Sequence, residues 1–275
     1  MRAVLLPLLG IVLGCSASPS DDPDHWVVDT DVNYALSIAP IRWIIPSDIV
    51  PSSIEVYPSN NNVDIEFYRG RLYLSWRSAP THFASSAAKM YVMSSSDNGS
   101  TWVFETEVSL GSDVREPRFF QSDGVLHLLF FQGGINPAAF EPQRMWTVSK
   151  GGNEWGSPEI YWDAPVVPWD IKSRYGSFWM TSYEGEHYSG AENPEIELFF
   201  ERSQNGFDWA PVGEERTVYL GGVSEAAFEF DQVGNLWAVT RNEDGDSTGF
   251  GSHVCFAAAD TLGDWECSEA SDPER

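Results

Sequence analysis

Four tryptophans recur at nearly constant spacing along this chain of 275 residues. Trp102, Trp155, Trp209 and Trp265 are separated by 53, 54 and 56 positions. Each closes a similar stretch, in which two apolar runs flank a glycine and a third run leads into a polar turn. Self-similarity at a period of about 20–50 residues is typical of repeat architectures. The chain from about residue 62 to residue 268 is therefore expected to consist of four similar units.

Within each unit, apolar and polar residues alternate. The first unit shows this in Asp64–Tyr68, Leu72–Arg77 and Met90–Met93, with Gly70 between the first two runs. Alternation bounded by Gly, Asn and Asp is typical of short β-strands, and no stretch shows a sustained helical period. The fold class predicted from the sequence is all-β, with antiparallel strands.

The composition indicates a packed domain with an acidic surface. A hydrophobic content of 42%, with 12 Trp and 16 Phe, is sufficient for a core. The formal net charge of -25 repels nucleic acid and anionic lipid. We therefore expect no nucleic-acid partner, and no membrane contact except through a lipid anchor. No Cys/His cluster has zinc-binding spacing, and no cofactor is expected.

The first residues have the pattern of an export signal. Arg2 is followed by a short apolar run, Ala3–Leu13, and the sequence turns polar from Ser16 onward. The apolar run is too short to span a bilayer as a helix. The sequence therefore predicts a signal peptide over residues 1–15.

The end of this segment, Val12–Cys15, resembles the lipobox of bacterial lipoproteins. The resemblance implies lipidation of Cys15, with residues 16–25 as a tether. It also implies a location in the cell envelope, as an outer-membrane lipoprotein, or outside the cell. Ordinary signal cleavage near Ala17 is the alternative.

Two further cysteines lie near the C-terminus. Cys255 and Cys267 flank a turn, so that two antiparallel strands would place them opposite each other. Because an exported protein meets an oxidising environment, we expect a disulfide between them. Two buried free thiols are the alternative.

The polar turns of the repeat carry a family resemblance. Ser95–Trp102 resembles a complete Asp-box, the S-x-D-x-G-x-x-W signature of sialidase-like β-propellers, and Ser203–Trp209 resembles a shorter variant. The resemblance implies a propeller of four-stranded antiparallel blades over residues 26–275. In that family these turns join outer strands, far from the active face. The residues expected to be structural for this reason are Ser95, Asp97, Gly99 and Trp102.

Residues ahead of the four units offer strands for one more, abbreviated blade. Five blades are the preferred prediction and four the alternative. The candidate strands of the additional blade are Trp26–Asp31, Tyr34–Ile38, Ile41–Ile45 and Ile54–Tyr57.

An acidic residue stands near the start of each unit. In a propeller the innermost strands line a central channel, so these carboxylates are expected to converge. Crowded carboxylates raise each other's pKa and can then divide the roles of acid, base and nucleophile in glycoside hydrolysis. The alternative is a structural role, in which they accept hydrogen bonds from backbone amides. The residues, at steps of 52, 54 and 55, are Asp64, Glu116, Asp170 and Glu225.

A second set of side chains follows each hairpin glycine by seven residues. We expect these side chains to share one level on neighbouring second strands. The set comprises Arg77, Phe131, Tyr183 and Arg241.

The segment Arg115-Glu116-Pro117 resembles the R-I-P motif of sialidases and the R-D-P motif of five-bladed glycosidases. The sialidase resemblance implies that Arg77, Arg115 and Arg241 bind a substrate carboxylate. It also implies that Tyr183 forms a nucleophile pair with Glu116 or Glu225.

Together these patterns predict an exported propeller that recognises a carbohydrate at the channel mouth, with glycoside hydrolysis as the reaction that its carboxylates would support. Glu184–Glu195 and Asn242–His253 are the expected rim loops of the pocket. The alternative is a non-catalytic surface propeller that binds a protein or polymer through its rim.

Overall fold

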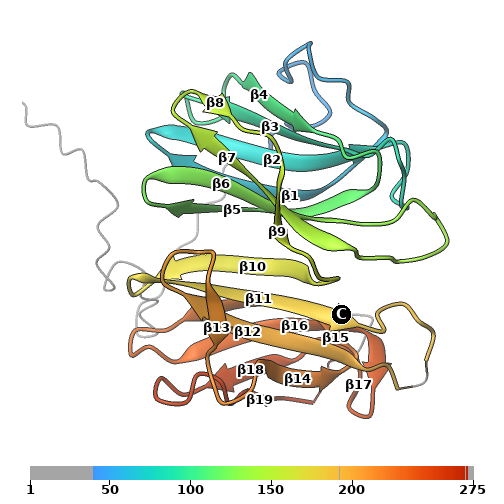
Figure 1. Ribbon diagram of the computed structural model, residues 1–275, viewed down its shortest axis with the longest axis vertical. Helices are drawn as coiled ribbons and strands as arrows, with labels where there is room; N and C mark the ends of the chain where they lie inside the picture. Colours follow the sequence, from blue (N-terminus) through green and yellow to red (C-terminus); the bar gives the residue numbers. More distant parts are fainter. Residues whose placement is uncertain (1–39, 192, 270, 272–275) are drawn as a thin grey trace, which may run out of the picture.

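The structure, a computed structural model, describes residues 40–191, 193–269 and 271. These residues form four antiparallel β-sheets and contain no helix (Figure 1). The prediction of an all-β propeller is confirmed. The predicted signal peptide, Cys15, the tether and the first two candidate strands, Trp26–Asp31 and Tyr34–Ile38, lie outside the described residues.

Each of the first two sheets corresponds to one sequence unit, and its strands follow one another in chain order. Sheet 1 consists of β1 (Ser59–Tyr68), β2 (Arg71–Ala79), β3 (Lys89–Ser95) and β4 (Val103–Val108). Sheet 2 consists of β5 (Val114–Ser122), β6 (Val125–Gln132), β7 (Arg144–Gly151), β8 (Glu154–Trp155) and β9 (Glu159–Trp162). Both β8 and β9 pair with β7, so the outer strand of this sheet is interrupted.

The other two sheets repeat this plan with interruptions of their own. Sheet 3 consists of β10 (Val167–Arg174), β11 (Ser177–Gly185), β12 (Ile196–Ser203), β13 (Trp209–Pro211) and β14 (Thr217–Gly221). Sheet 4 consists of β15 (Val223–Phe230), β16 (Leu236–Asp246), β17 (Gly249–Gly251), β18 (Val254–Ala257) and β19 (Glu266–Cys267). The innermost strands of the four sheets are therefore β1, β5, β10 and β15.

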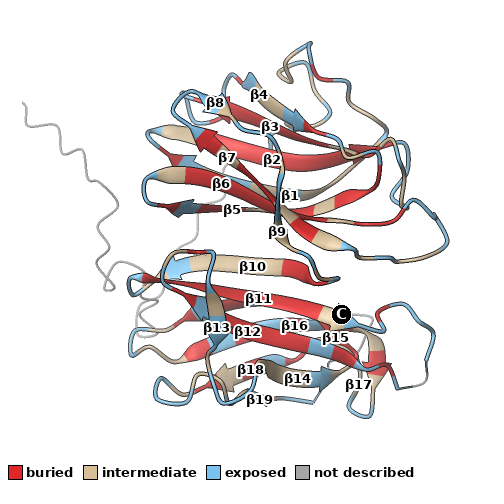
Figure 2. Ribbon diagram, in the orientation of Figure 1, coloured by how far each residue is buried: buried red, intermediate tan, exposed pale blue. Residues whose placement is uncertain are grey.

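Consecutive sheets pack face to face through apolar side chains. On β6, Leu128 and Phe130 join the core shared with sheet 1, whereas Leu129 and Phe131 join the core shared with sheet 3. Side chains of a strand alternate between its two faces, so a strand that is apolar throughout is buried on both sides. Figure 2 shows this burial in β2, β6 and β11. A third core, around Trp179 on β11, joins sheet 3 to sheet 4.

The predicted strands Ile41–Ile45 and Ile54–Tyr57 are not strands in the structure. Residues 40–58 instead form turns and irregular backbone, and Ile54 packs against Leu74 and Trp76 on the face of sheet 1. Prolines at positions 46 and 51 lack the amide hydrogen that a sheet ladder requires. The described residues contain four blades, and part of this segment covers sheet 1 without pairing. The covering residues are Ile44, Ile45, Ile49, Val50, Ile54 and Val56.

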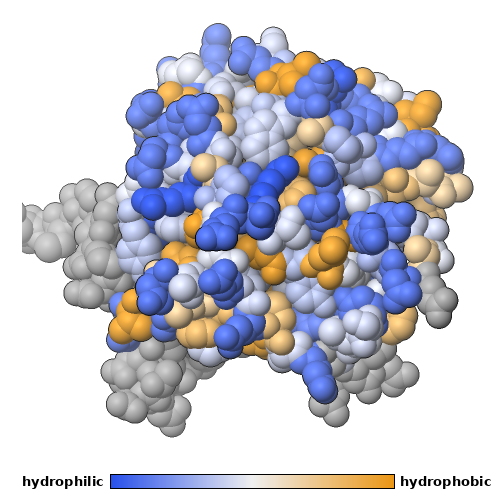
Figure 3. Space-filling view, turned by 60° about the horizontal axis from the view of Figure 1, so that its bottom comes forward, coloured by the Kyte–Doolittle hydropathy of each residue, from blue (hydrophilic) through white to orange (hydrophobic). Residues whose placement is uncertain are grey.

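Some apolar side chains remain exposed on sheet 4. Trp237 and Val239 on β16 and Val254 on β18 are each about half exposed, at 48%, 56% and 51%. Figure 3, which brings the lower part of Figure 1 forward, shows hydrophobic residues among hydrophilic ones on that face. These side chains lie on the face of the sheet opposite Phe228 and Phe230, which are buried against sheet 3.

The turn that resembles the Asp-box joins β3 to β4. The Ser95 hydroxyl accepts a hydrogen bond from the Gly99 amide at 2.7 Å, and Asp97 accepts one from the Thr101 amide at 2.8 Å. Hydrogen bonds from Thr101 and Ser95 lower the pKa of Asp97 to about 2. Gly99 has a φ of 78°, which glycine adopts without strain. These contacts fix the hairpin on the outer side of the blade, away from the innermost strand.

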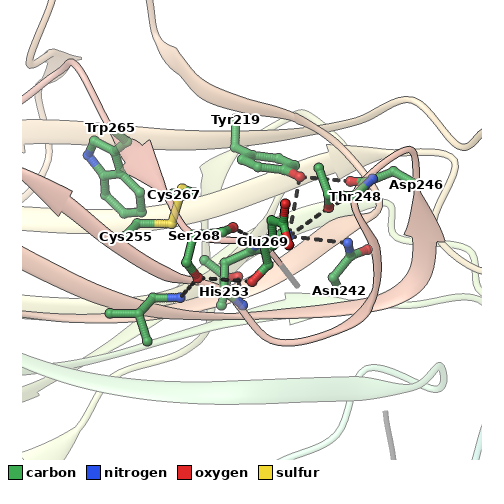
Figure 4. The surroundings of a disulfide bond; sticks show 12 residues. Tyr219, Asn242, Asp246, Thr248, His253, Cys255, Trp265, Cys267, Ser268 and Glu269 are labelled. Atoms are coloured by element: carbon green, nitrogen blue, oxygen red, sulfur yellow. Dashed lines mark hydrogen bonds between the residues drawn. A yellow bond between two sulfur atoms is a disulfide. The ribbon is translucent and has the colours of Figure 1, made fainter. Parts of the chain in front are cut away.

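The predicted disulfide between Cys255 and Cys267 is confirmed, and it joins β18 to β19. Figure 4 shows His253 beside it, on the same side of the sheet end. Nδ1 of His253 lies 2.6 Å from the carbonyl oxygen of Ser268, so this nitrogen donates the hydrogen bond. Nε2 of His253 lies 3.2 Å from the Asn242 side-chain amide. The disulfide and His253 together hold the C-terminal strand on sheet 4.

Candidate functional site

All four innermost strands carry a β-bulge at the same place, near the end of the strand where the chain enters it. A bulge inserts an unpaired residue and redirects the neighbouring side chains, and bulges are frequent next to active sites. In β5 the bulge comprises two residues, Glu116 and Pro117, opposite Phe130. The corresponding unpaired residues of the other three strands are Asn62, Trp169 and Ser224.

The register of the four hairpins corrects the predicted alignment of the four carboxylates. Asp64 and Asp170 occupy equivalent positions, opposite Ser75 and Thr181. In sheet 2 the equivalent position is taken by Arg118, because Glu116 lies within the bulge. In sheet 4 it is taken by Ala226, one residue beyond Glu225. The four carboxylates therefore lie at two levels along the strands.

The second predicted level is displaced in the same way. Arg77, Phe131 and Tyr183 are equivalent, since each lies six residues after the first paired residue of its strand. In sheet 4 that position belongs to Asn242, because the hairpin of this sheet is longer, and Arg241 faces Glu225 instead.

A cavity of about 560 Å³ opens at the bulged ends of the innermost strands. We call it the mouth cavity. Side chains from all four sheets and from the loops between them line it. Of the predicted site residues, those that line it are Arg115, Glu116, Tyr183, Glu225 and Arg241.

Glu116 is a largely enclosed carboxylate of the mouth cavity, with 8% of the residue exposed. Its side chain accepts a hydrogen bond from the Asn62 amide and lies 3.3 Å from Arg118. Burial raises the pKa of Glu116, and the charges of Arg118 and Arg115 oppose this rise. The backbone of Glu116 has a φ of 52°, which is uncommon for a residue with a side chain and is frequent at functional sites.

Glu225 approaches the same cavity from sheet 4. Arg241 contacts it at 2.9 Å, which lowers its pKa, but burial raises the pKa by more, and the charge of Glu116 adds to the rise. The resulting pKa of Glu225 is about 7. Two carboxyl groups that influence each other in one cavity are the arrangement in which one stays protonated and the other ionised.

Tyr183 lies between these carboxylates and the core. Only 3% of the residue is exposed, and burial together with the charges of Glu225 and Glu116 raises the pKa of its hydroxyl well above the usual value. The hydroxyl therefore stays protonated at neutral pH.

The three predicted substrate-binding arginines are all engaged with acidic side chains. Arg77 is fully buried and binds Asp113 at 2.8 Å. Arg115 binds the other oxygen of Asp113 at 2.6 Å. Arg241 stands across the cavity, bound to Glu225. The structure brings Arg115 and Arg241 to the mouth cavity, and it places Arg77 behind the cavity wall.

Asp64 and Asp170 line a different cavity of about 400 Å³, to which all four innermost strands contribute. We call it the channel cavity. Asp64 accepts a hydrogen bond from the amide of Phe119 on the next sheet at 2.5 Å. Asp170 accepts one from the amide of Phe228, again on the next sheet, at 3.1 Å. Through these hydrogen bonds the two aspartates link neighbouring blades. Trp169 lines both cavities and separates them.

Several mouth residues come from loops that have no counterpart in the repeat, and the sequence pattern did not assign them. His187 is held by Asp244 at 2.5 Å, and its ring stacks on Tyr188 at 3.7 Å between centroids. Tyr188 in turn donates to Glu243 at 2.5 Å. These contacts join the predicted rim loop Glu184–Glu195 to the segment Asn242–His253. The second segment was also predicted as a rim loop, but it contains the end of β16 and the whole of β17, which pair as a hairpin. The length of the two segments was the only sequence signal.

Within the described residues, no group of three or more His, Cys, Asp or Glu side chains has an arrangement that could hold a metal ion. None of the described segments forms a helix of the length and hydropathy needed to cross a bilayer.

Comparison with known proteins gives likenesses in structure alone. No protein-family model and no curated protein matches the chain. A protein of unknown function from Dyadobacter fermentans is similar with a TM-score of 0.56 and 16% identity, over 77% of this chain and 71% of that one. A family 117 glycoside hydrolase from Zobellia galactanivorans is similar with a TM-score of 0.51 and 12% identity, over 78% of this chain and 70% of that one.

A mutant sialidase from Trypanosoma rangeli has a TM-score of 0.49 and 16% identity, and the similarity covers 78% of this chain but only 38% of the sialidase. At these identities the first two likenesses show the fold, and function has to be argued from the site. The chain therefore shares its β-propeller fold with the proteins from D. fermentans and Z. galactanivorans.

Proposed function

We propose that the protein binds a carbohydrate in the mouth cavity and hydrolyses a glycosidic bond there. The observation that carries the proposal is the pair of carboxylates, Glu116 and Glu225, that line one cavity with different partners. Hydrolysis of a glycoside requires one carboxylic acid and one carboxylate on either side of the bond.

The environments of the two residues assign their roles. Glu225 has a pKa of about 7, so it holds a proton under mildly acidic conditions and serves as the general acid. Burial raises the pKa of Glu116 as well, and the hydrogen bond from Asn62 and the charge of Arg118 oppose this rise by favouring the ionised form. On the strength of these two contacts we assign Glu116 the role of base or nucleophile. Tyr183, protonated and next to both, donates a hydrogen bond to the sugar.

The rest of the cavity suits a sugar. Its volume of about 560 Å³ lies within the usual range for small-molecule sites, roughly 300–1,000 Å³. Phe140, Trp169 and Tyr188 supply aromatic surfaces against which the C–H face of a sugar ring can pack. Apolar walls with a few polar groups at one end are typical of ligand pockets.

The test is release of sugar from a panel of glycosides and polysaccharides, measured by reducing ends and by chromatography. We expect release from at least one member, with a loss of about 100-fold or more in Glu225→Gln and Glu116→Gln, since general acid–base groups contribute about 10²–10⁴. Asp170→Asn, which alters the channel cavity, is the matched control. No release by the native protein, or release unaffected by Glu225→Gln, contradicts the proposal.

Binding without turnover in the same panel would instead support the alternative of a non-catalytic carbohydrate-binding propeller. Capture of a protein partner that survives both substitutions would place the interaction on the rim.

We also propose that the protein is exported and carries lipid on Cys15. Support comes from the lipobox resemblance and from the disulfide Cys255–Cys267, since disulfides persist in oxidising compartments. Incorporation of a labelled fatty acid into the native chain, and its loss in Cys15→Ala, tests this. A mature N-terminus near Ala17 without lipid would contradict it.

A further inference from the structure

We infer that the mouth cavity selects uncharged sugars over sugars that carry a carboxylate, and that Glu243 is a specificity-determining residue. This inference rests on the proposed carbohydrate site. It reverses what the sialidase resemblance of the arginines implies, because each of these arginines already has an acidic partner within the protein.

Arg241 shows this most clearly. One terminal nitrogen of its guanidinium contacts Glu225 at 2.9 Å, and the other contacts Glu243 at 2.6 Å. An arginine binds a substrate carboxylate best through two parallel hydrogen bonds from one side of its planar fork. With an internal carboxyl group on each terminal nitrogen, a substrate carboxylate would have to displace one of them or approach the negative charge of Glu243.

Glu243 is itself held in place from the rim. Its second oxygen accepts the hydrogen bond from the Tyr188 hydroxyl at 2.5 Å. The amide of Tyr188 donates to Asp244 at 3.0 Å, so the rim loop and the end of β16 fix each other. Both oxygens of Glu243 therefore have a partner, and the side chain cannot move aside without breaking two contacts.

The arginines of the opposite wall are also held within the protein. Nε of Arg115 donates to Asp113 at 2.6 Å, and one of its terminal nitrogens donates to the carbonyl oxygen of His82 at 2.6 Å. Arg77 has no exposed side-chain surface and lies behind Asp113. Both arginines thus bind the Asp113 carboxylate, and Arg77 is out of reach of a ligand. The formal net charge of -25 further disfavours the approach of an anionic polymer.

The test compares binding of matched ligand pairs, such as galactan and galacturonan oligosaccharides or lactose and sialyllactose, by calorimetry or affinity electrophoresis. We expect the native protein to bind the neutral member at least about tenfold more tightly, equivalent to about 1.4 kcal/mol, because the acidic member loses hydration without gaining an unoccupied arginine. Glu243→Gln removes one charge from Arg241 and is expected to raise the ratio of acidic to neutral binding by about fivefold or more.

Glu229→Gln is the matched control, because it removes a carboxylate from another arginine pair, Arg174–Glu229 at 2.8 Å, that does not line the cavity. It should leave the ratio unchanged. Equal or tighter binding of the acidic member by the native protein overturns this inference and leaves the proposed function standing. A neutral preference that Glu243→Gln does not alter overturns the role of Glu243. Absence of binding to every carbohydrate contradicts the proposed function itself.

Discussion

Glu225 forms an ion pair with Arg241 at 2.9 Å and yet has a pKa of about 7. Burial and the nearby charge of Glu116 outweigh the attraction of the arginine. A carboxyl group whose pKa is raised in the folded protein stabilises the fold below its unfolded pKa, and this stabilisation is lost as pH rises through the folded pKa.

Glu225 should therefore make the native protein less stable as pH rises from 4.5 to about 7. We expect a loss on the order of 3 kcal/mol relative to Glu225→Gln over this window, since one pKa unit corresponds to about 1.4 kcal/mol. Urea unfolding of both proteins at pH 4.5, 6 and 8 measures it. A constant difference between them across these pH values would show that the pKa of Glu225 is not raised.

The hydrogen bond from the Phe119 amide to Asp64 predicts that substitution of Asp64 lowers stability without changing catalysis. Asp64→Ala leaves a buried amide without an acceptor and should lower the free energy of unfolding by about 1–3 kcal/mol. Asp64→Asn retains an oxygen acceptor and should cost less. Both variants should keep their activity per folded molecule. A specific loss of activity in Asp64→Asn would indicate that the reaction takes place in the channel cavity.

The fold was predictable because the same pattern of strands and turns recurs in all four sequence units. Alternating strands, hairpin glycines and Trp102, Trp155, Trp209 and Trp265 all indicate the same plan, and consistent local signals specify a structure well. The additional blade was not predictable in the same way. Apolar residues such as Ile54 can be buried by packing on a sheet as well as by joining one.

The site was predictable only in part, because a bulge at Glu116 and a longer hairpin after Glu225 change the register of these two residues. Glu116 and Glu225 were identified as candidates, but counting along the repeat placed them with Asp64 and Asp170. One unpaired residue in a strand moves the neighbouring side chains to another level of the sheet. The spacings between successive carboxylates, 52 and 54 residues, do not show where such an unpaired residue lies. Pro117, which cannot donate to the ladder, was the one local signal of the bulge in β5.

Contacts between rim loops were not predictable at all. His187 and Asp244 belong to different blades, and neither occupies a repeated position. Their pairing follows from how the blades pack, which the sequence does not show directly.

The rim contacts predict how the Glu184–Glu195 loop responds to the loss of Asp244. Asp244→Ala removes the acceptor of both His187 and the Tyr188 amide, so that amide should exchange its hydrogen at least about tenfold faster, equivalent to roughly 1.4 kcal/mol. Hydrogen exchange followed by mass spectrometry measures it. Asp244→Asn, which keeps one oxygen acceptor, should show a smaller change, and equal exchange in all three proteins would indicate that the contact does not hold the loop.

The disulfide predicts a redox dependence of stability. It closes a loop with a sequence separation of 12, and the paired change Cys255→Ser with Cys267→Ser should lower the free energy of unfolding by about 2–3 kcal/mol. The native protein with reductant should unfold at the same urea concentration as this variant. Identical stability of the oxidised native protein and the variant would contradict a stabilising role.

The most direct test of the central claim is the rate of sugar release, on whichever panel substrate is cleaved fastest, as a function of pH for the native protein, Glu225→Gln and Asp170→Asn. We expect the native rate to fall as pH rises through about 7, where Glu225 loses its proton. Asp170→Asn should retain this profile, and Glu225→Gln should lose nearly all activity. A profile unchanged in Glu225→Gln, or abolished by Asp170→Asn alone, would contradict a catalytic site in the mouth cavity.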